Sequence, residues 1–307
     1  MLVSGCVLYD LQIRNYIRIK RYVVKYAGKK DKDMSEVKLL VLDLDGTLLN
    51  EKKQISERNR EVLLKAQNEK GMRIAIGSGR DYDYARKVSE PLELDSHKGF
   101  LICNNGQKVF DCETQIMNEI RSITHTGGRI AMSYAELNSL EIRGSIGTVK
   151  YFHNCHEGTA KNGEEDLGYN PDTGFFDTDQ DFDKIVVFTS EKYTLDDDHR
   201  AVEELRGLLG EHDDVTLVAP HVIDLVAKGV DKTSGIEWIA EHYDIEKDEI
   251  LVMGDGENDL PAALKYPFSA MANSMESVLK AASRVTLSNE EDGVAYEVER
   301  SVLKTAE

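Results

Sequence analysis

Hydrophobic and polar positions along residues 37–103 alternate between short apolar runs and longer amphipathic segments. A largely apolar run such as 37–44, in which only Lys38 and Asp43 are polar, is typical of a strand that is buried on both faces of a parallel sheet. Capping residues delimit the helical segments, as Ser56 does before one helix and Gly71 after it. The elements predicted in chain order are strand 37–44, helix 56–68, strand 72–76, helix 82–90, strand 99–103 and a turn at Asn105 and Gly106. This alternation predicts a doubly wound α/β fold around a parallel sheet.

The pattern changes after Met117 and returns near residue 230. Residues 121–220 include 20 acidic and 9 basic side chains, a net charge of 9 − 20 = −11. The elements predicted after this change are strand 184–189, helix 196–209, a hairpin of strands 215–219 and 222–227, helix 232–243, strand 249–253 and a helix from near Asp259. We therefore predict a core domain formed by residues 35–117 and 227–307, with an inserted α+β domain at 118–226.

The first 33 residues differ in charge from the rest of the chain. Eight Lys and Arg against three Asp and Glu give them a net charge of +5, whereas residues 34–307 carry 30 − 53 = −23. Tyr and Ile alternate with Arg and Lys from Arg14 to Lys25, which leaves two interpretations open. One is an amphipathic basic arm that contacts a membrane or a partner protein. The other, which we favour, is a basic N-terminal extension at 1–34 that the core does not need.

Composition narrows the functional classes. The chain has 307 residues, of which 41% are hydrophobic and 31% charged, with a formal net charge of −18. This charge repels phosphate backbones, so we expect no nucleic-acid partner and no stable membrane association. No apolar run approaches the roughly 18–20 residues that a membrane span needs. The four cysteines are scattered along the chain, which predicts reduced thiols in a cytoplasmic protein.

Carboxylates follow one of the predicted buried strands. Asp43 and Asp45 lie on either side of Leu44, where strand 37–44 ends. Ligands of open α/β sheets bind beyond the carboxyl ends of the strands, where paired carboxylates suit a divalent cation or a nucleophile. An acidic turn that binds no ligand would explain the sequence Asp-Leu-Asp-Gly-Thr at 43–47 equally well. A calcium loop would not, because its sixth and twelfth positions, which need Gly and Glu, hold Leu48 and Gln54.

Three further segments at strand or helix ends carry chemistry of the same kind. The sequence Gly-Asp-Gly-Glu-Asn-Asp at 254–259 follows strand 249–253 and opens a helix. Ser78 lies between two glycines after strand 72–76, where a hydroxyl and backbone amides can approach a phosphate closely. Lys232 begins a helix and can supply a positive charge to the same phosphate. Each of these segments alone would be interpreted as a turn or a helix end without a ligand. Together with the carboxylates after the first strand, they form four segments whose order indicates a phosphate site.

These motifs resemble those of the haloacid dehalogenase superfamily of phosphatases. Asp43–Thr47 matches the first motif of that family, Ser78 the second, Lys232 the third and Gly254–Asp259 the fourth. The position of the insertion is similar to that of the Cof-type subfamily (subfamily IIB), which carries a C2-type cap. The chain departs from the family pattern at Ala272, where Gly is common, and at Ser78, where Thr is common. Neither departure removes a reactive group.

The resemblance implies a mechanism and a set of site residues. Asp43 would be the nucleophile, and Asp45 the general acid and base, a role that requires a raised carboxyl pKa. Mg²⁺ would be held by Asp43, Asp255 and the backbone carbonyl of Asp45, and Asp259 would orient Lys232 or a metal-bound water. The residues expected to bind the phosphoryl group are Leu44, Ser78, Gly79, Lys232 and Asn258.

The function predicted from the sequence is therefore a Mg²⁺-dependent phosphatase that hydrolyses small-molecule phosphate monoesters, either sugar phosphates or phosphorylated cofactors. Two alternatives remain at this stage. A phosphosugar mutase would return the phosphoryl group from the aspartate to a sugar, and product analysis separates it from a hydrolase. A non-catalytic phospho-acceptor module would be phosphorylated once without turnover, although it would need neither Asp45 nor a large cap domain.

Overall fold

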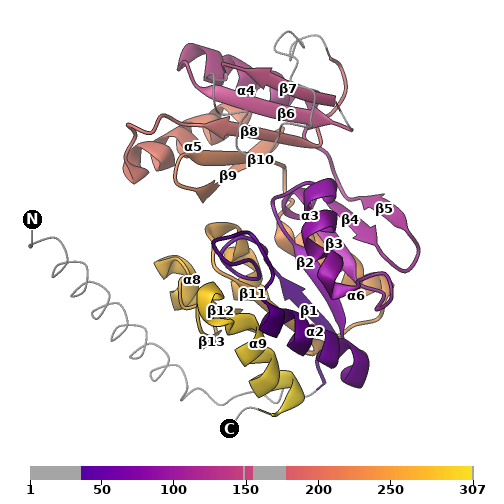
Figure 1. Cartoon of the computed structure of the whole chain (residues 1–307). Helices are drawn as coiled ribbons and strands as arrows, with labels where there is room; N and C mark the ends of the chain where they lie inside the picture. The colour runs from indigo at the N-terminus through magenta and orange to yellow at the C-terminus, as the bar shows by residue number, and fades with distance from the viewer. Residues whose placement is uncertain (1–35, 148, 155–177, 306–307) are drawn as a thin grey trace, which may run out of the picture.

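The computed structural model describes residues 36–147, 149–154 and 178–305. They form two sheets of unequal size, stacked one above the other in Figure 1. The predicted N-terminal extension lies outside the described residues, as do residues 155–177 of the acidic segment 121–220. Among the described helices, none is both long enough and apolar enough to cross a membrane. Cys103 and Cys112 are free and buried, as expected for reduced thiols.

The larger sheet has eight strands, and its centre is parallel. β1 lies between β2 and β11 and pairs in parallel with both, which places three strand ends predicted to carry chemistry side by side. β4 and β5 add an antiparallel edge. The strands in spatial order are β13 (Arg284–Val285), β12 (Phe268–Ala270), β11 (Ile250–Gly254), β1 (Leu39–Leu42), β2 (Arg73–Gly77), β3 (Phe100–Cys103), β4 (Lys108–Asp111) and β5 (Ile116–Glu119).

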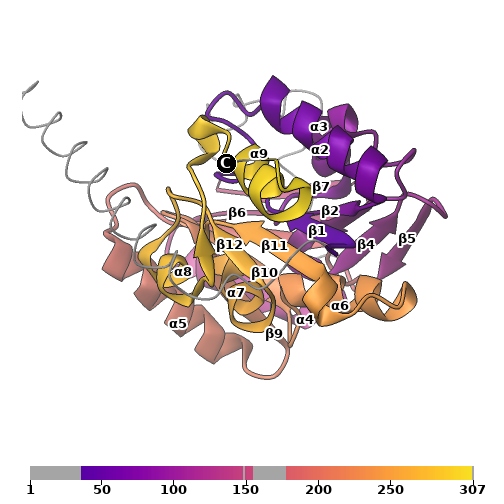
Figure 2. The ribbon, with the colours of Figure 1, turned by 90° about the horizontal axis from the view of Figure 1, so that it is seen from below.

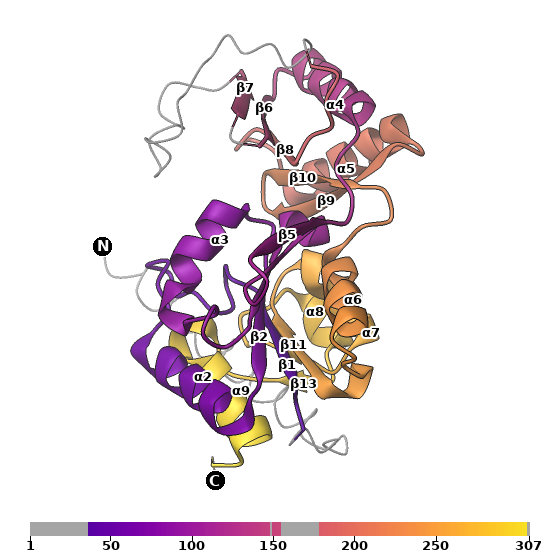
Figure 3. The same ribbon diagram turned by 90° about the vertical axis from the view of Figure 1, so that its right-hand side faces the viewer.

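Helices cover both faces of this sheet, so its strands are buried on both sides (Figures 2 and 3). On β1, Leu40 and Leu42 pack toward one helical layer, whereas Leu39 and Val41 pack toward the other, as the two-residue period of a strand requires. The first layer contains α2 (Glu57–Lys70), α3 (Tyr82–Ser89) and α9 (Gly293–Val298). The second contains α6 (Lys232–His242), α7 (Leu260–Lys265) and α8 (Glu276–Ala281). The predicted α/β fold is confirmed.

The smaller sheet has five strands, all antiparallel, with two helices packed on one face. Its strands in spatial order are β7 (Val149–His153), β6 (Glu141–Ile146), β8 (Lys184–Phe188), β10 (Val222–Ala227) and β9 (Asp213–Ala219). α4 (His125–Leu137) and α5 (Leu195–Leu209) bury their apolar residues against it. The other face of the sheet is turned toward the strand ends of the larger sheet.

The boundaries of the sheets differ slightly from the predicted domain boundaries. β5 belongs to the eight-stranded sheet and runs to Glu119, so the boundary predicted between residues 117 and 118 falls inside a strand. β10 belongs to the five-stranded sheet and ends at Ala227, one residue past the second predicted boundary. The division of the chain into a core domain and an inserted domain stays a prediction.

Candidate active site

The carboxyl ends of β1, β2 and β11 bring the predicted site residues to one edge of the larger sheet. Asp43 follows β1, and its backbone N–H donates to the carbonyl of Met253 on β11 at 3.0 Å. Ser78 follows β2, and Asp255 follows β11. Parallel pairing of neighbouring strands therefore places side chains that are far apart in the sequence around one point.

Lys232 is buried under this point, with 1% of its side chain exposed. Its Nζ donates to Asp43 Oδ1 at 2.8 Å and also to Asp259 Oδ1. Burial alone would lower the pKa of Lys232, but the two carboxylates outweigh it and raise this pKa above its ordinary value. Asp259 is itself fixed, because its Oδ2 accepts the backbone N–H groups of Asp255 at 3.0 Å and of Gly256 at 3.1 Å. Asp259 thus holds the lysine against Asp43. The orienting role of Asp259 stays a prediction.

The cluster contains more negative than positive charge. Asp43, Asp255 and Asp259 each offer a carboxylate oxygen, and these oxygens lie within 4.8 Å of one another. Burial raises the pKa of Asp43 well above its ordinary value; Lys232 opposes the rise, and Asp259 and Asp255 add to it. Burial, reinforced by Asp259, raises the pKa of Asp255 to about 7, although Thr47 donates its hydroxyl to Asp255 Oδ1 at 2.9 Å. Oxygen ligands with excess negative charge are what a hard divalent cation requires.

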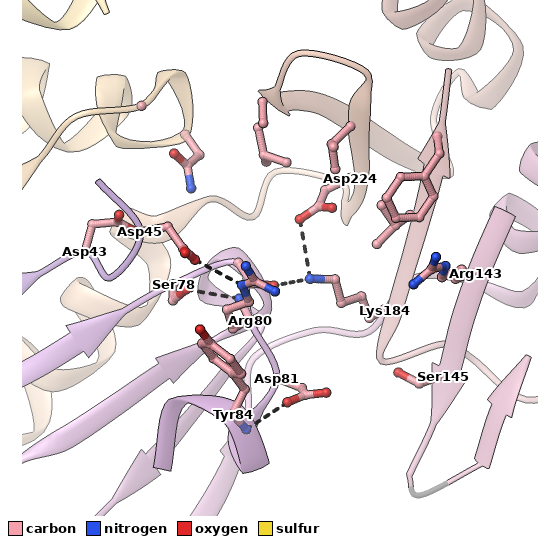
Figure 4. Close-up of a pocket in the computed structure, with 18 of the residues that line it drawn as sticks. Asp43, Asp45, Ser78, Arg80, Asp81, Tyr84, Arg143, Ser145, Lys184 and Asp224 are labelled. Atoms are coloured by element: carbon pink, nitrogen blue, oxygen red, sulfur yellow. Dashed lines mark hydrogen bonds and ion pairs between the residues drawn. The ribbon is translucent and has the colours of Figure 1, made fainter. Parts of the chain in front are cut away.

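Asp45 lies at the mouth of the cluster and is turned toward two basic side chains. Its Oδ2 accepts from Arg80 Nε at 3.0 Å (Figure 4). Its Oδ1 accepts from Lys53. Burial raises the pKa of Asp45, but the two cations outweigh it and hold this pKa below its ordinary value. The prediction that Asp45 has a raised pKa, as a general acid requires, is therefore wrong for this state of the protein. The reason is that the sequence did not reveal Arg80 and Lys53 as partners of Asp45.

The predicted phosphate-binding residues lie in three different settings. Ser78, Gly79 and Asn258 line one pocket together with Asp43 and Asp255. The Ser78 hydroxyl accepts the backbone N–H of Arg80 at 3.1 Å. The Leu44 side chain is fully buried in the core, so the backbone is the part of Leu44 that can face a ligand, and Lys232 reaches the cluster from beneath Asp43.

A chain of polar contacts joins this site to the smaller sheet. Asn258 donates its side-chain amide to Asn105 Oδ1 at 3.2 Å, and Asn105 in turn donates to Asp224 Oδ2 at 2.9 Å. Asp224 lies on β10 and is 3.7 Å from Lys184 Nζ on β8. Lys184 completes this series of contacts, because its ammonium also donates to the carbonyl of Gly79 (Figure 4). Two strands of the smaller sheet are thus tied to two predicted phosphate-binding segments.

The pocket between the two sheets has a volume of about 620 Å³. Its floor is the carboxylate cluster, and its roof is the five-stranded sheet. The roof residues were not among the predicted site residues; they include Arg143, Lys184, Val186, Phe188, Val222 and Asp224. The alternating pattern of Lys184, Val186 and Phe188 along one predicted strand is the signal that would have pointed to them.

Comparison with known proteins agrees with this architecture. The family described as haloacid dehalogenase-like hydrolase matches residues 40–298. A relative in Bacillus subtilis, 5-amino-6-(5-phospho-D-ribitylamino)uracil phosphatase YcsE, is 28% identical over 272 residues, covering 87% of this chain and 97% of that protein. Phosphatase YwpJ of the same organism is 28% identical over 300 residues, covering 85% and 98%.

Solved structures are similar over the same length. A haloacid dehalogenase-like hydrolase from Bacteroides thetaiotaomicron has a TM-score of 0.74 at 29% identity, covering 86% of this chain and 98% of that one. A sugar phosphatase of haloacid dehalogenase subclass IIB has the same TM-score and coverage at 23% identity, which shows a common fold.

Proposed function

The chain belongs to the haloacid dehalogenase-like hydrolases, in the Cof-type branch predicted from its sequence, and we propose that it is a Mg²⁺-dependent phosphatase of small-molecule phosphate monoesters. The observation that carries this proposal is the contact between Lys232 Nζ and Asp43 Oδ1 beside Asp255, on the floor of a pocket large enough for a metabolite. A carboxylate held in this way is a nucleophile with one oxygen fixed and the other available to attack phosphorus.

The negative charge of the cluster supports a divalent cation. Asp43, Asp255 and the backbone carbonyl of Asp45 would hold Mg²⁺, and their oxygen ligands fit this ion. When bound, the ion supplies positive charge that lets a carboxylate approach a phosphate dianion. Lys232 contributes to the same end from the protein side, because its ammonium neutralises charge on Asp43 and on the entering phosphoryl group.

The reaction proceeds in two displacements at phosphorus. Asp43 attacks, the bond from phosphorus to the alcohol oxygen breaks, and protonated Asp45 gives its proton to that oxygen. Water then attacks the aspartyl-phosphate while the Asp45 carboxylate takes its proton, which releases phosphate and restores Asp43. The Ser78 hydroxyl, the Lys232 ammonium, the Asn258 side chain and the backbone amides of Leu44 and Gly79 would hold the phosphoryl oxygens.

The role of Asp45 requires that its surroundings change when substrate binds. In the state described here, Arg80 and Lys53 keep the pKa of Asp45 low. A phosphate dianion bound beside Asp43 would compete for these two cations and place a like charge near Asp45. Both effects raise a carboxyl pKa, so substrate itself would bring Asp45 into its acid form. Substrates of this class include sugar phosphates and phosphorylated cofactors; the relative YcsE is named for a phosphorylated ribitylaminouracil, which is also a small-molecule phosphate monoester.

Phosphate release from a panel of monoesters tests the proposal. We expect release from several esters in Mg²⁺, loss of release in EDTA, and a loss of at least about a thousandfold in Asp43→Asn. Asp196→Asn makes the same chemical change on an exposed helix and should retain full activity. Release that persists in Asp43→Asn would overturn the mechanism. An isomerised sugar phosphate without free phosphate would identify a mutase, and a single phosphorylation without turnover a phospho-acceptor.

A further inference from the structure

The turn that follows β3 has an unusual backbone conformation. The angle φ is +50° at Asn104, +53° at Asn105 and +97° at Gly106. A residue other than glycine is strained in this left-handed region, so contacts with its surroundings must hold it there. The contacts of this turn extend to both sheets. The turn is therefore a place where the smaller sheet can act on the phosphate-binding residues.

The residue next to this turn, Gln107, holds the two segments that connect the sheets. Its backbone carbonyl accepts the N–H of Ile120 at 2.8 Å, and its side-chain Oε1 accepts the N–H of Ala227 at 3.2 Å. Its Nε2 donates at 2.9 Å to the backbone carbonyl that directly precedes β8. Because β10 ends at Ala227, these contacts fix Asp224 on that strand relative to Asn105.

The contact between Asp224 and Asn105 determines which way the Asn105 amide is turned. An ionised carboxylate accepts hydrogen bonds and donates none. Lys184 Nζ lies 3.7 Å from Asp224 Oδ2 and favours the ionised form of Asp224 (Figure 4). Asn105 must therefore direct its nitrogen to Asp224, and its Nδ2 donates to Oδ2 at 2.9 Å. The carbonyl oxygen of the Asn105 side chain is left for Asn258.

The orientation of Asn105 in turn sets that of Asn258. Because Asn105 Oδ1 can only accept, Asn258 presents its nitrogen, and its Nδ2 lies 3.2 Å from that oxygen. Asn258 Oδ1 lies instead against Gly256, where a Cβ atom would be 2.7 Å from it. The second N–H of Asn258 Nδ2 is thus left for a ligand in the pocket that Asn258 lines. An inverted amide would direct a carbonyl oxygen to the phosphoryl group and repel it.

We propose that Asp224 is a positioning residue for phosphoryl transfer: through Asn105, it fixes the amide of Asn258 with a donor toward the phosphoryl group. The inference rests on the proposed function and goes beyond it, because a strand of the smaller sheet acquires an indirect part in the reaction at phosphorus. The phosphoryl group itself is still bound by residues that follow strands of the larger sheet. The effect of Asp224 is then the same for every monoester, since all carry the same phosphoryl group.

Asp224→Asn tests the proposal, because it keeps the shape of the side chain but adds a donor, so that the orientation of Asn105 is no longer determined. We expect kcat/KM to fall by at least about tenfold, and by the same factor for p-nitrophenyl phosphate and for glucose 6-phosphate. Asp224→Glu keeps a carboxylate and should retain more activity than Asp224→Asn, although it changes the side-chain volume more. A residue that acted only by packing would give the reverse order.

A double-mutant cycle tests the link from Asp224 to Asn258. Asn258→Ala removes the amide that Asp224 orients, so the addition of Asp224→Asn should lower kcat/KM by less than about twofold further. Asn105→Gly interrupts the same series of contacts at its middle, in a backbone conformation that glycine adopts readily. It should lower kcat/KM as much as Asp224→Asn does, and it serves as the test if Asp224→Asn does not fold.

A matched control separates positioning from folding. Asp213 is a buried carboxylate on β9 that accepts from the Thr124 hydroxyl and lies outside the pocket, so Asp213→Asn should lower stability without changing kcat/KM. Activity within about twofold of the unmodified protein in Asp224→Asn or Asn105→Gly, or a full tenfold further loss in the Asn258→Ala background, would overturn the positioning role and leave the phosphatase intact. Failure of the unmodified protein to hydrolyse any ester would overturn the proposed function, and this inference with it.

Discussion

Gly46 illustrates how one residue brings two distant motifs together. Its φ of +79° lies in the left-handed region that favours glycine. A Cβ atom built at this position would be 2.3 Å from Asp255 Oδ2, so only glycine leaves room for that carboxylate. The tight turn after β1 therefore does more than reverse the chain. It allows Asp255 to approach the cluster that contains Asp43.

We predict that Gly46→Ala lowers phosphatase activity by at least about tenfold, because Asp255 must move out of the carboxylate cluster. Gly71→Ala is the matched control. Gly71 also has a positive φ, of 62°, but nothing lies within 4 Å of its added Cβ. Gly71→Ala should therefore cost about 1–2 kcal/mol of unfolding free energy and leave kcat unchanged. Steady-state kinetics and thermal unfolding of both variants measure this, and equal kinetic effects would contradict the interpretation.

At the scale of elements, local signals predict the core helices well. Ser56 caps α2 through a hydrogen bond of its side chain with the backbone N–H of Asn59, and Gly71 ends it in the left-handed conformation. Both residues act on the chain next to them, so the sequence reveals them directly. The same holds for the strand ends that carry Asp43, Ser78 and Asp255.

The elements of the smaller sheet were harder to predict. α4 contains Gly127 and Gly128, which are poor helix formers, and its range was not predicted. A Cβ at Gly128 would be 2.5 Å from the Phe182 ring, and one at Gly127 would be 1.9 Å from Asp213. These glycines are therefore required by contacts with distant segments, which a single sequence does not reveal. The contact between Asp45 and Arg80 was not predicted for the same reason, because it joins two distant segments.

The polar chain between the two sheets gives a pH-dependent prediction. Burial raises the pKa of Asp224, although Lys184 and Asn105 oppose the rise. Without Lys184 this pKa would rise further, so the extra destabilisation of the variant would accumulate as the pH rises from the pKa of Asp224 in the unmodified protein to its higher pKa in the variant. Lys184→Met should therefore lose about 1–3 kcal/mol of unfolding free energy near pH 8 and much less near pH 5.

Denaturant unfolding at the two pH values measures this difference. The double variant Lys184→Met with Asp224→Asn is the control, because it has no carboxylate to ionise at this position. Its stability relative to Asp224→Asn alone should not change between the two pH values. An equal loss at both pH values in Lys184→Met alone would mean that Lys184 stabilises the fold by packing and not through the charge of Asp224.

At the scale of the whole molecule, the site exists only because two sheets are stacked. The larger sheet supplies the carboxylate cluster and Lys232, and the smaller sheet covers them and supplies Arg143 and Phe188. In the proposed function, the reaction at phosphorus and the binding of the alcohol part of the substrate are thus assigned to different structural layers. The sequence could predict the first layer, because its residues follow strands in a specific order. The second layer was not predicted, because its residues become neighbours only across antiparallel strands; the alternation along β8 was the one signal for it.

Detection of the phosphoryl-enzyme tests the central claim most directly. Asp45→Asn removes both the acid for the first displacement and the base for the second. With Mg²⁺ and an ester whose leaving group needs no proton, such as p-nitrophenyl phosphate, Asp43 should still be phosphorylated, and the intermediate should accumulate until it is quenched in acid. We predict that peptide mass spectrometry then finds one phosphoryl group, carried by Asp43, and none in the double variant with Asp43→Asn. A phosphoryl group on any other residue, or steady turnover with no phosphorylated Asp43 at any time, would contradict the account.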